Sequence, residues 1–194
     1  MEYFLGIDIG GTKVAVSLWS EAAQLLDKLR FEMIPGQTPT EVFDQLIQGG
    51  QALLAKHHIL NLKSIGISSA GPIDVTAGVI VDAPNLPGWK NVQIVAPFKK
   101  AFGVPVRLEN DANAAALAEW QFGAGRGHRS LIYITLSSGV GGGLIINNQL
   151  WAGFRGNAGE VGHIVLEPEG KLCACGFRGC WEAYCGGKNV QKDL

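Results

Sequence analysis

The segment from residue 163 to residue 180 holds one histidine and three cysteines with the spacing of a metal site. Cys173, Cys175 and Cys180 form a C-x-C-x₄-C pattern, and His163 precedes them. Three thiolates and one imidazole complete a tetrahedral zinc site of the closed, structural type. A disulfide would need an oxidising compartment, for which the sequence gives no sign. The pattern therefore predicts a structural zinc ion, with Cys185 outside the site, although Cys185 could replace His163 as a ligand.

Two glycine-rich turns have the residue types that bind phosphate. The first lies in "GIDIGGTK", residues 6–13, between two apolar runs that predict a β-hairpin, with Asp8 expected to be buried. The second lies in "SSGVGGG", residues 137–143, again between apolar runs. Backbone N–H groups and hydroxyls in such turns can form anion-binding concavities. The repeated arrangement predicts two similar lobes that hold a nucleotide, and the alternative is two unrelated hairpins.

Neither turn fits the common phosphate motifs. A P-loop requires Lys before Ser or Thr, whereas Thr12 here precedes Lys13. A dinucleotide fingerprint requires a third glycine where this chain has Leu144, and a strand rather than a helix is expected to follow. The prediction is therefore a hairpin-type phosphate site.

Asp111 stands at the start of an alanine-rich helix expected over residues 112–122, with Gly123 as its stop. An aspartate at this position is most often a plain N-cap, and this segment alone favours that interpretation. The functional alternative is a carboxylate that is held rigidly at a strand-to-helix junction and accepts a proton from a bound hydroxyl.

The remaining pattern predicts an α/β protein. Strands are expected near residues 3–9, 14–19, 29–34, 64–69 and 105–110. Between the third and fourth strands, an amphipathic helix is expected from its apolar residues, with Thr38 or Thr40 as N-cap and Gly49 and Gly50 weakening its middle; those apolar residues are Val42, Leu46, Leu53 and Leu54. The loop "APNLPGWKN" is expected to expose Trp89.

The composition excludes several classes of protein. The 194 residues are 47% hydrophobic, and the formal net charge of −1 argues against a nucleic-acid surface. The beginning, "MEYFLGIDIG", lacks the features of a signal peptide. The longest uncharged stretch, residues 130–148, is interrupted by glycines and too polar for a membrane span. A cytoplasmic protein with neither nucleic-acid nor membrane partners is expected.

Taken together and in this order, "DIGGTK", "ENDANAAALAEW", "SSGVGGG", "GEVGH" and "CACGFRGCWE" resemble the ROK family of repressors, open reading frames and sugar kinases. The resemblance covers residues 3 to about 187. It implies an actin-like (ribonuclease H-like) two-lobed α/β fold, with one lobe over residues 1–111 and the start of a second over residues 112–194. Relatives continue beyond the cysteines, so the second lobe is expected to be incomplete, with apolar faces uncovered and ATP bound poorly.

The resemblance also implies roles for individual residues. Asp111 is similar to the family's catalytic base. The residues similar to sugar ligands are Asn85, Asn110, Asp111, Glu160, His163 and Glu182. The residues similar to the surroundings of ATP phosphates and Mg²⁺ are Asp8, Gly10, Gly11, Thr12, Lys13, Ser138, Gly139 and Gly141. His163 could bind zinc with one ring nitrogen and a sugar hydroxyl with the other. The second turn departs from the Gly-Thr-Gly of many relatives, because Ser137 and Ser138 precede Gly139, but a hydroxyl is kept.

The function implied is ATP-dependent phosphorylation of a hexose, with glucose converted to glucose 6-phosphate, by a protein that forms a homodimer in its full-length form. The alternatives are an N-acetylmannosamine or fructose kinase, a sugar-binding regulator without catalysis, and an inactive fragment. A regulator of this family carries an N-terminal helix-turn-helix, for which a first strand at Tyr3 leaves no room in this sequence.

Overall fold

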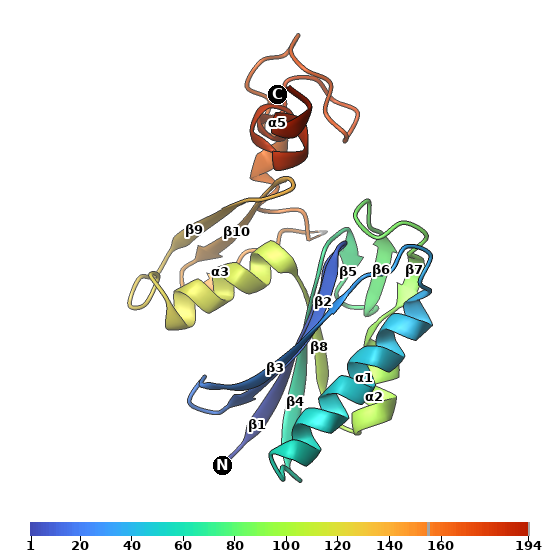
Figure 1. Ribbon diagram of the computed structural model, residues 1–194. Coiled ribbons are helices and arrows are strands. Elements are labelled where there is room, and N and C mark those ends of the chain that lie inside the picture. Colours follow the sequence, from blue (N-terminus) through green and yellow to red (C-terminus); the bar gives the residue numbers. More distant parts are fainter. Residues whose placement is uncertain (155, 194) are drawn as a thin grey trace. The chain divides into compact units, whose positions relative to one another are not determined.

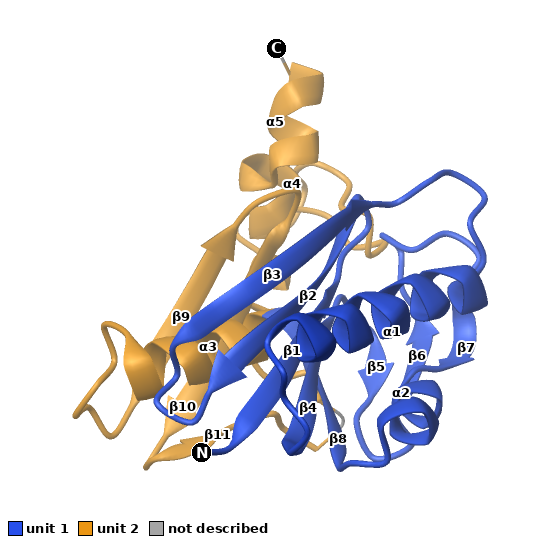
Figure 2. Cartoon of the chain, turned by 60° about the horizontal axis from the view of Figure 1, so that its bottom comes forward, with its two compact units in different colours: residues 1–111 blue, residues 112–194 orange. Residues whose placement is uncertain are grey.

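The computed structural model describes residues 1–154 and 156–193. It contains two compact units, Met1–Asp111 and Ala112–Leu194, which Figure 2 shows in different colours. Both units combine helices with sheet, so the α/β class predicted from the sequence is confirmed.

The first unit is built on a five-stranded sheet with the order β3-β2-β1-β4-β8. The strands are β1 (Tyr3–Ile9), β2 (Lys13–Ser20), β3 (Leu25–Glu32), β4 (Leu62–Ser69) and β8 (Val106–Asn110). β1 to β3 form an antiparallel meander, whereas β4 runs parallel to β1 and β8 runs parallel to β4. Helix α1 (Pro39–Lys56) lies between β3 and β4 in the chain, and α2 (Val95–Phe102) precedes β8. Both helices cover one face of the sheet (Figure 1).

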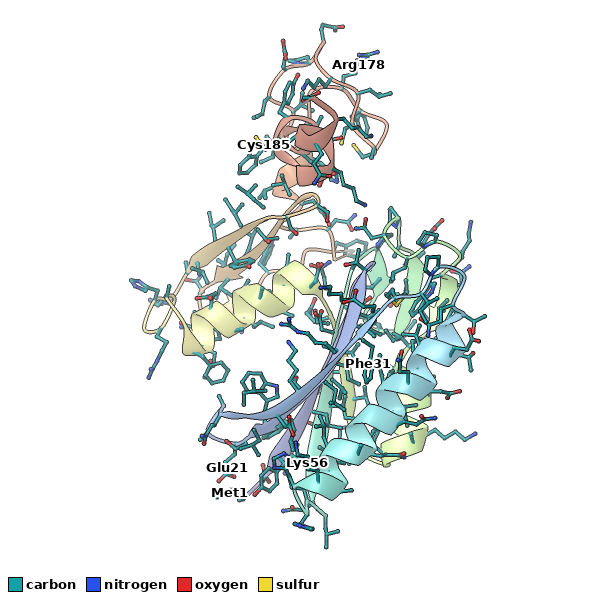
Figure 3. All side chains as sticks on the ribbon, viewed as in Figure 1. Met1, Glu21, Phe31, Lys56, Arg178 and Cys185 are labelled. Carbon is teal, nitrogen blue, oxygen red and sulfur yellow. The ribbon has the colours of Figure 1, made fainter. Side chains whose placement is uncertain are left out.

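The alternation of side chains along the strands separates an apolar face from a polar one. Leu5, Ile7 and Ile9 of β1 are buried in the core with the apolar residues of β2 and α1. Phe31 of β3 packs against this core on the side of α1 (Figure 3). Asp8 belongs to the opposite face and is exposed, so the expectation that it is buried was wrong. Because successive side chains of a strand point to opposite faces, Asp8 faces away from the core that its neighbours Ile7 and Ile9 enter.

Helix α1 begins with a complete capping box. The Thr38 hydroxyl accepts the N–H of Glu41, and the Glu41 carboxylate accepts the N–H of Thr38 at 2.7 Å. Gly49 and Gly50 are buried in the middle of the helix rather than being weak points on its surface. A Cβ atom at Gly50 would lie 3.2 Å from Leu5 Cδ1 of the sheet. These glycines therefore let the helix approach the sheet closely.

Three short strands that lie between β4 and α2 in the chain form a small second sheet. It is formed by β5 (Ile73–Asp74), β6 (Val79–Asp82) and β7 (Lys90–Gln93) in that order. The loop between β6 and β7 is anchored by Trp89, which is only 2% exposed and packs edge-on against Phe43 of α1 at 5.4 Å. The expectation of an exposed Trp89 was wrong, because this indole fills the core beside α1. β3 also lies earlier than predicted, since its register with β2 runs from Leu25 to Glu32.

The second unit contains a three-stranded antiparallel sheet with the order β11-β10-β9. Its elements are α3 (Asp111–Phe122), β9 (Leu131–Leu136), β10 (Val140–Ile146), β11 (Gln149–Leu150), the 3₁₀ turn η1 (Val161–His163), α4 (Trp181–Cys185) and α5 (Gly187–Asp193). Helix α3 packs on the glycines of β10, where a Cβ atom at Gly143 would lie 2.6 Å from Ala116 Cβ.

One face of β9 carries an apolar stripe. Ile132, Ile134 and Leu136 alternate along the strand and are 67%, 45% and 62% exposed. Three large apolar side chains on one strand face are more than the scattered exposed residues of ordinary surfaces. Among residues 1–154 and 156–193, none of the helices combines the length and the apolar character that crossing a membrane requires.

Candidate active site and metal centre

Three parallel strands of the first unit end in one row. Ile9 of β1 is the register partner of Ser69 of β4, which is in turn the partner of Asn110 of β8. Carboxyl ends of parallel strands meet at one edge of a sheet, which is where open α/β sheets bind ligands. The first glycine turn, the turn after β4 and Asp111 therefore share this edge.

The first glycine turn is held closely against Asn85. A Cβ atom at Gly11 would lie 2.2 Å from the Asn85 carbonyl oxygen, so only glycine permits this approach. The turn closes with a hydrogen bond from the Gly10 N–H to the Lys13 carbonyl at 3.1 Å. Lys13 itself begins β2, and its ammonium lies 3.5 Å from the Glu32 carboxylate. The structure thus brings Asn85 beside the turn, while Lys13 has an acidic neighbour.

Asn110 and Asp111 form the strand-to-helix junction at which β8 of the first unit continues into α3. Asn110 Nδ2 lies 3.3 Å from the position that a Cβ atom of Gly71 would take. Asp111 is the first residue of the twelve-residue helix α3 and is exposed. Asp111 therefore combines a fixed backbone position with access from solvent.

In the second unit, the turn Ser137–Gly139 joins β9 to β10. Gly141 lies in β10 itself, where a Cβ atom would be 3.4 Å from Ala112 Cβ of α3. The Glu182 carboxylate accepts the N–H of Val140 at 2.7 Å. The structure therefore brings Glu182 to the glycine turn, a contact that the sequence pattern did not predict.

The segment with Glu160 and His163 packs on the backbone of β10. A Cβ atom at Gly162 would lie 2.2 Å from the Val140 carbonyl oxygen. The two ring nitrogens of His163 have different neighbours. Nε2 lies 4.0 Å from the Glu160 carboxylate, whereas Nδ1 lies 3.7 Å from Cys173 Sγ. One imidazole thus faces a carboxylate with one nitrogen and a thiol with the other.

The four residues with metal-ligand spacing form one cluster. One ligand atom from each of His163, Cys173, Cys175 and Cys180 lies within 4.8 Å of all the others. Cys175 Sγ is 3.6 Å from Cys180 Sγ, and Cys173 Sγ is 3.7 Å from His163 Nδ1. Zinc–sulfur bonds of ~2.3 Å in a tetrahedron separate the ligand atoms by ~3.8 Å, so the donor set fits zinc. Cys185, on α4, is exposed and is not a member of the cluster (Figure 3).

The thiols of the cluster have unequal acidities. Burial raises the pKa of the Cys180 thiol to about 12, and hydrogen bonds with Cys175 and Cys173 add to this effect. Burial also acts to raise the pKa of Cys175, but hydrogen bonds from the Phe177 backbone and the neighbouring thiols outweigh it and lower that pKa. A bound cation would favour the thiolate form of all three.

A side-chain network beside the cluster was not found from the sequence. The Tyr184 hydroxyl donates to Glu167 and accepts the N–H of Lys171 at 3.0 Å. The Lys171 ammonium pairs with Asp193 of α5 and lies 5.3 Å from the Tyr184 ring centroid. These residues are far apart in sequence and have no motif spacing, so no sequence signal marks them. They connect the cysteine-containing loop to α4 and α5.

The predicted site residues thus form two groups. The first unit holds Asp8, Gly10, Gly11, Thr12, Lys13, Asn85, Asn110 and Asp111. The second unit holds Ser138, Gly139, Gly141, Glu160, His163, Cys173, Cys175, Cys180 and Glu182. Within each unit, a glycine turn lies beside residues that the family resemblance links to sugar.

Curated relatives include both enzymes and regulators. A glucokinase of Streptomyces coelicolor is 39% identical over 184 residues, which are 95% of this chain and 56% of that protein. A xylose repressor of Bacillus subtilis is 35% identical, with 99% of this chain and 50% of that protein covered. An N-acetylmannosamine kinase of Yersinia pestis is 34% identical, with 96% and 62% covered. The chain therefore spans about half to three-fifths of the length of these relatives.

The similar solved structures include sugar kinases, and this chain again covers only part of each. A ROK hexokinase of Thermus thermophilus has a TM-score of 0.86 at 37% identity, covering 98% of this chain and 62% of that one. A ROK glucokinase of Streptomyces griseus, solved with glucose and AMPPNP, has a TM-score of 0.78 at 38% identity, covering 98% and 59%. The chain has part of the actin-like fold of these sugar kinases. The ROK family model matches residues 4–194, and the chain belongs to the ROK family.

Proposed function

We propose that the chain is the sugar- and phosphate-binding part of an ATP-dependent hexose kinase, with glucose as its substrate. The observation that carries the proposal is the position of Asp111, which starts α3 directly after Asn110 at the carboxyl edge of the parallel strands of the first sheet. Relatives named as glucokinases, at 39% identity, support sugar phosphorylation. The bound glucose and AMPPNP of the Streptomyces griseus enzyme supply the substrate classes.

Each unit contains residues that could bind sugar hydroxyls. Asn85 and Asn110 would bind sugar hydroxyls through amides that both donate and accept hydrogen bonds. In the second unit, Glu160 and the Nε2 atom of His163 would do the same, and their separation of 4.0 Å allows one hydroxyl to reach both. Glu182 would contribute the carboxylate oxygen that does not accept the Val140 N–H.

The phosphates of ATP would be bound by the two glycine turns. In the first turn, the groups that bind phosphate would be the Gly11 N–H, the Thr12 hydroxyl and the Lys13 ammonium, because the Gly10 N–H already donates to the Lys13 carbonyl. In the second, they are the hydroxyl of Ser138 and the backbone at Gly139, while Gly141 lets α3 approach. Mg²⁺ enters with ATP as part of the substrate, and the exposed carboxylate of Asp8 is an oxygen ligand of the kind it prefers.

The chemical step needs little from the protein beyond positioning and one proton acceptor. Asp111 would take the proton of the sugar 6-hydroxyl while its oxygen attacks the γ-phosphorus atom. The bond from that phosphorus to the bridging oxygen breaks, and ADP leaves with the electron pair. The products are the hexose 6-phosphate, ADP and the proton on Asp111, which is then lost to water. General-base assistance of this kind contributes about 10²- to 10⁴-fold to the rate.

Zinc would be held by His163 through Nδ1 and by Cys173, Cys175 and Cys180. The fit of the four ligand atoms to a tetrahedron supports this assignment. A closed set of four protein ligands leaves no open position, so the ion would stabilise the loop and orient His163 rather than take part in the reaction. Free thiols suit the reducing cytoplasm, where we place the protein.

A second candidate function is sugar sensing without catalysis. The similarity to a xylose repressor favours it, because the same residues that bind a sugar for phosphorylation can bind one for regulation. N-acetylmannosamine is a further candidate substrate through the kinase of Yersinia pestis. Both candidates share the sugar contacts and differ in the need for Asp111.

A substrate panel separates these possibilities. The purified chain is incubated with ATP, Mg²⁺ and glucose, fructose, mannose or N-acetylmannosamine, and ADP release is measured. The proposal expects the highest kcat/KM with glucose. ADP release with N-acetylmannosamine alone would reassign the substrate, and sugar binding without ADP release from any member would favour the sensor. A parallel measurement on the longest form encoded by the gene tests homodimer formation by light scattering.

A further inference from the structure

The Glu182 carboxylate spans from helix α4 to the second glycine turn. Its Oε2 atom accepts the N–H of Val140 at 2.7 Å. The position that a Cβ atom of Gly139 would take is 2.3 Å from the same oxygen, so any side chain there would displace the carboxylate. Gly139 does not have a positive φ, and its lack of a side chain is therefore explained by this contact rather than by its backbone conformation.

The residues that follow Glu182 hold the other side of the turn. The N–H of Gly187 donates to the Ser137 carbonyl at 2.8 Å, and the N–H of Lys188 donates to the Ser138 carbonyl at 3.1 Å. Helix α4 is fixed in turn, because the Glu182 carbonyl accepts the side-chain amide of Asn189 at 2.9 Å. The turn is thus bound at three consecutive peptides by one short segment, residues 182–188.

Val140 is only 4% exposed, so its N–H needs a partner within the protein. A carboxylate is the strongest acceptor that a side chain offers to a backbone N–H. The contact also places a negative charge beside a turn that the proposed function assigns to phosphate. This arrangement fixes the turn and leaves the Val140 N–H unavailable to a ligand.

We propose that Glu182 is a positioning residue for the second phosphate-binding turn, in addition to the sugar contact that the family resemblance implies. Its Oε2 atom holds the Gly139–Val140 peptide in one conformation, so that phosphate is met by the Ser138 hydroxyl and the backbone at Gly139 rather than by the Val140 N–H. The relevance to phosphate rests on the proposed kinase function. The conformational role does not, because it concerns the chain without ligands.

Hydrogen–deuterium exchange of residues 137–141, without sugar or nucleotide, tests the conformational role. Glu182→Ala removes the acceptor and is expected to speed exchange there by about tenfold or more, as the loss of a hydrogen bond to a charged group would. Glu182→Gln keeps an acceptor oxygen of the same reach and is expected to stay within about threefold of the parent. Glu169→Ala, at an exposed glutamate in the loop before Cys173, is the matched control and leaves the exchange unchanged.

A second variant approaches the contact from the other side. Gly139→Ala inserts a methyl group where the carboxylate lies and is expected to raise the same exchange rates. Combined with Glu182→Ala, it adds little, because both changes break one contact. Unchanged exchange at residues 137–141 in Glu182→Ala would overturn the proposal. So would an equal increase throughout β9, β10 and α3, which would indicate general destabilisation.

The link to phosphate is tested by steady-state kinetics. Glu182→Ala is expected to raise the KM for ATP by about tenfold, and Glu182→Gln is expected to restore most of it. A change in the KM for sugar alone, together with unchanged exchange, would mean that Glu182 only contacts the sugar. If the longest form encoded by the gene phosphorylates nothing but shows the expected exchange pattern, the kinase proposal is contradicted and the positioning role stays intact.

Discussion

The Nδ1 atom of His163 lies 3.7 Å from the Sγ atom of Cys173. The other ring nitrogen, Nε2, lies 4.0 Å from a carboxylate oxygen of Glu160. The imidazole therefore connects the cysteine cluster to a residue that the proposed function assigns to the sugar. A metal ion on Nδ1 would fix both the ring orientation and the tautomer that presents Nε2 to a hydroxyl.

This relationship predicts that metal loss affects stability and sugar binding together. Cys175→Ser removes one of four ligands, so zinc per chain should fall from about one to near zero, and Tm should fall. Cys185→Ser is the control, because that thiol is exposed and outside the cluster. Elemental analysis and thermal unfolding check both variants. Equal zinc content in Cys175→Ser and the parent would show that the cluster is not the metal site.

The close approach of Gly11 to Asn85 predicts an intolerant position. Gly11→Ala would place a methyl group against the Asn85 carbonyl, and overpacking of this kind costs about 1–3 kcal/mol in the free energy of unfolding. Gly66→Ala is the control, because a Cβ atom in β4 at that position meets nothing within 4 Å and the backbone φ is not positive. Denaturant unfolding measures both. Equal stability of the two variants would argue against the observed packing of the first turn.

The ion pairs of Asp27 predict a dependence of stability on pH. Asp27 accepts hydrogen bonds from Lys56 at 2.8 Å and from the His57 ring at 2.9 Å, and these partners hold the pKa of its carboxyl far below the ordinary value of 3.8. A lowered native pKa stabilises the fold above the ordinary pKa, and this contribution is lost as pH falls towards the native pKa. Asp27→Asn should therefore lower Tm at pH 7, by an amount that shrinks below about pH 4.

Thermal unfolding of the parent and Asp27→Asn between pH 7 and pH 3 provides the measurement. The matched control is Asp44→Asn, at an exposed position on α1. A difference in Tm that stays constant over the whole range would mean that the carboxylate charge is not responsible.

The local elements were predictable where the signal lies in short sequence spacing. Alternating apolar residues identified both hairpins. A threonine N-cap, Thr38 or Thr40, was expected for α1, and Thr38 is the residue that caps it. The four candidate metal ligands were found because tetrahedral zinc imposes both residue type and number. In these cases the determining interactions join neighbours along the chain or follow from one donor set.

Features that depend on distant packing were not predictable. Trp89 was expected to be exposed because its loop is rich in proline and glycine, but Phe43 of α1 covers it. Gly50 was expected to weaken α1, whereas the helix needs it to approach Leu5. The contact between Glu182 and Val140 joins residues 42 positions apart and has no local pattern. Such contacts follow from the fold and are not visible in residue spacing.

The apolar stripe on β9 predicts self-association of the chain. Ile132 and Leu136 are each more than 60% exposed on one strand face, and burying them against a second copy would remove apolar surface from water. Ile132→Thr with Leu136→Thr keeps strand propensity and should shift the chain towards monomer. Light scattering over a range of concentrations makes the comparison. A parent chain that stays monomeric at all of them would show that the stripe does not drive association.

The central claim is that Asp111 accepts the proton of the sugar hydroxyl during phosphoryl transfer, and Asp111→Asn tests it most directly. Asparagine keeps the shape and the helix-capping ability of aspartate but is no base, so sugar affinity should change little. The rate of ADP release should fall about 100-fold or more. The measurement pairs calorimetric sugar titration with a coupled assay, in the longest active form of the protein. Loss of turnover with intact sugar binding is the predicted result, and turnover within about threefold of the parent would contradict the account.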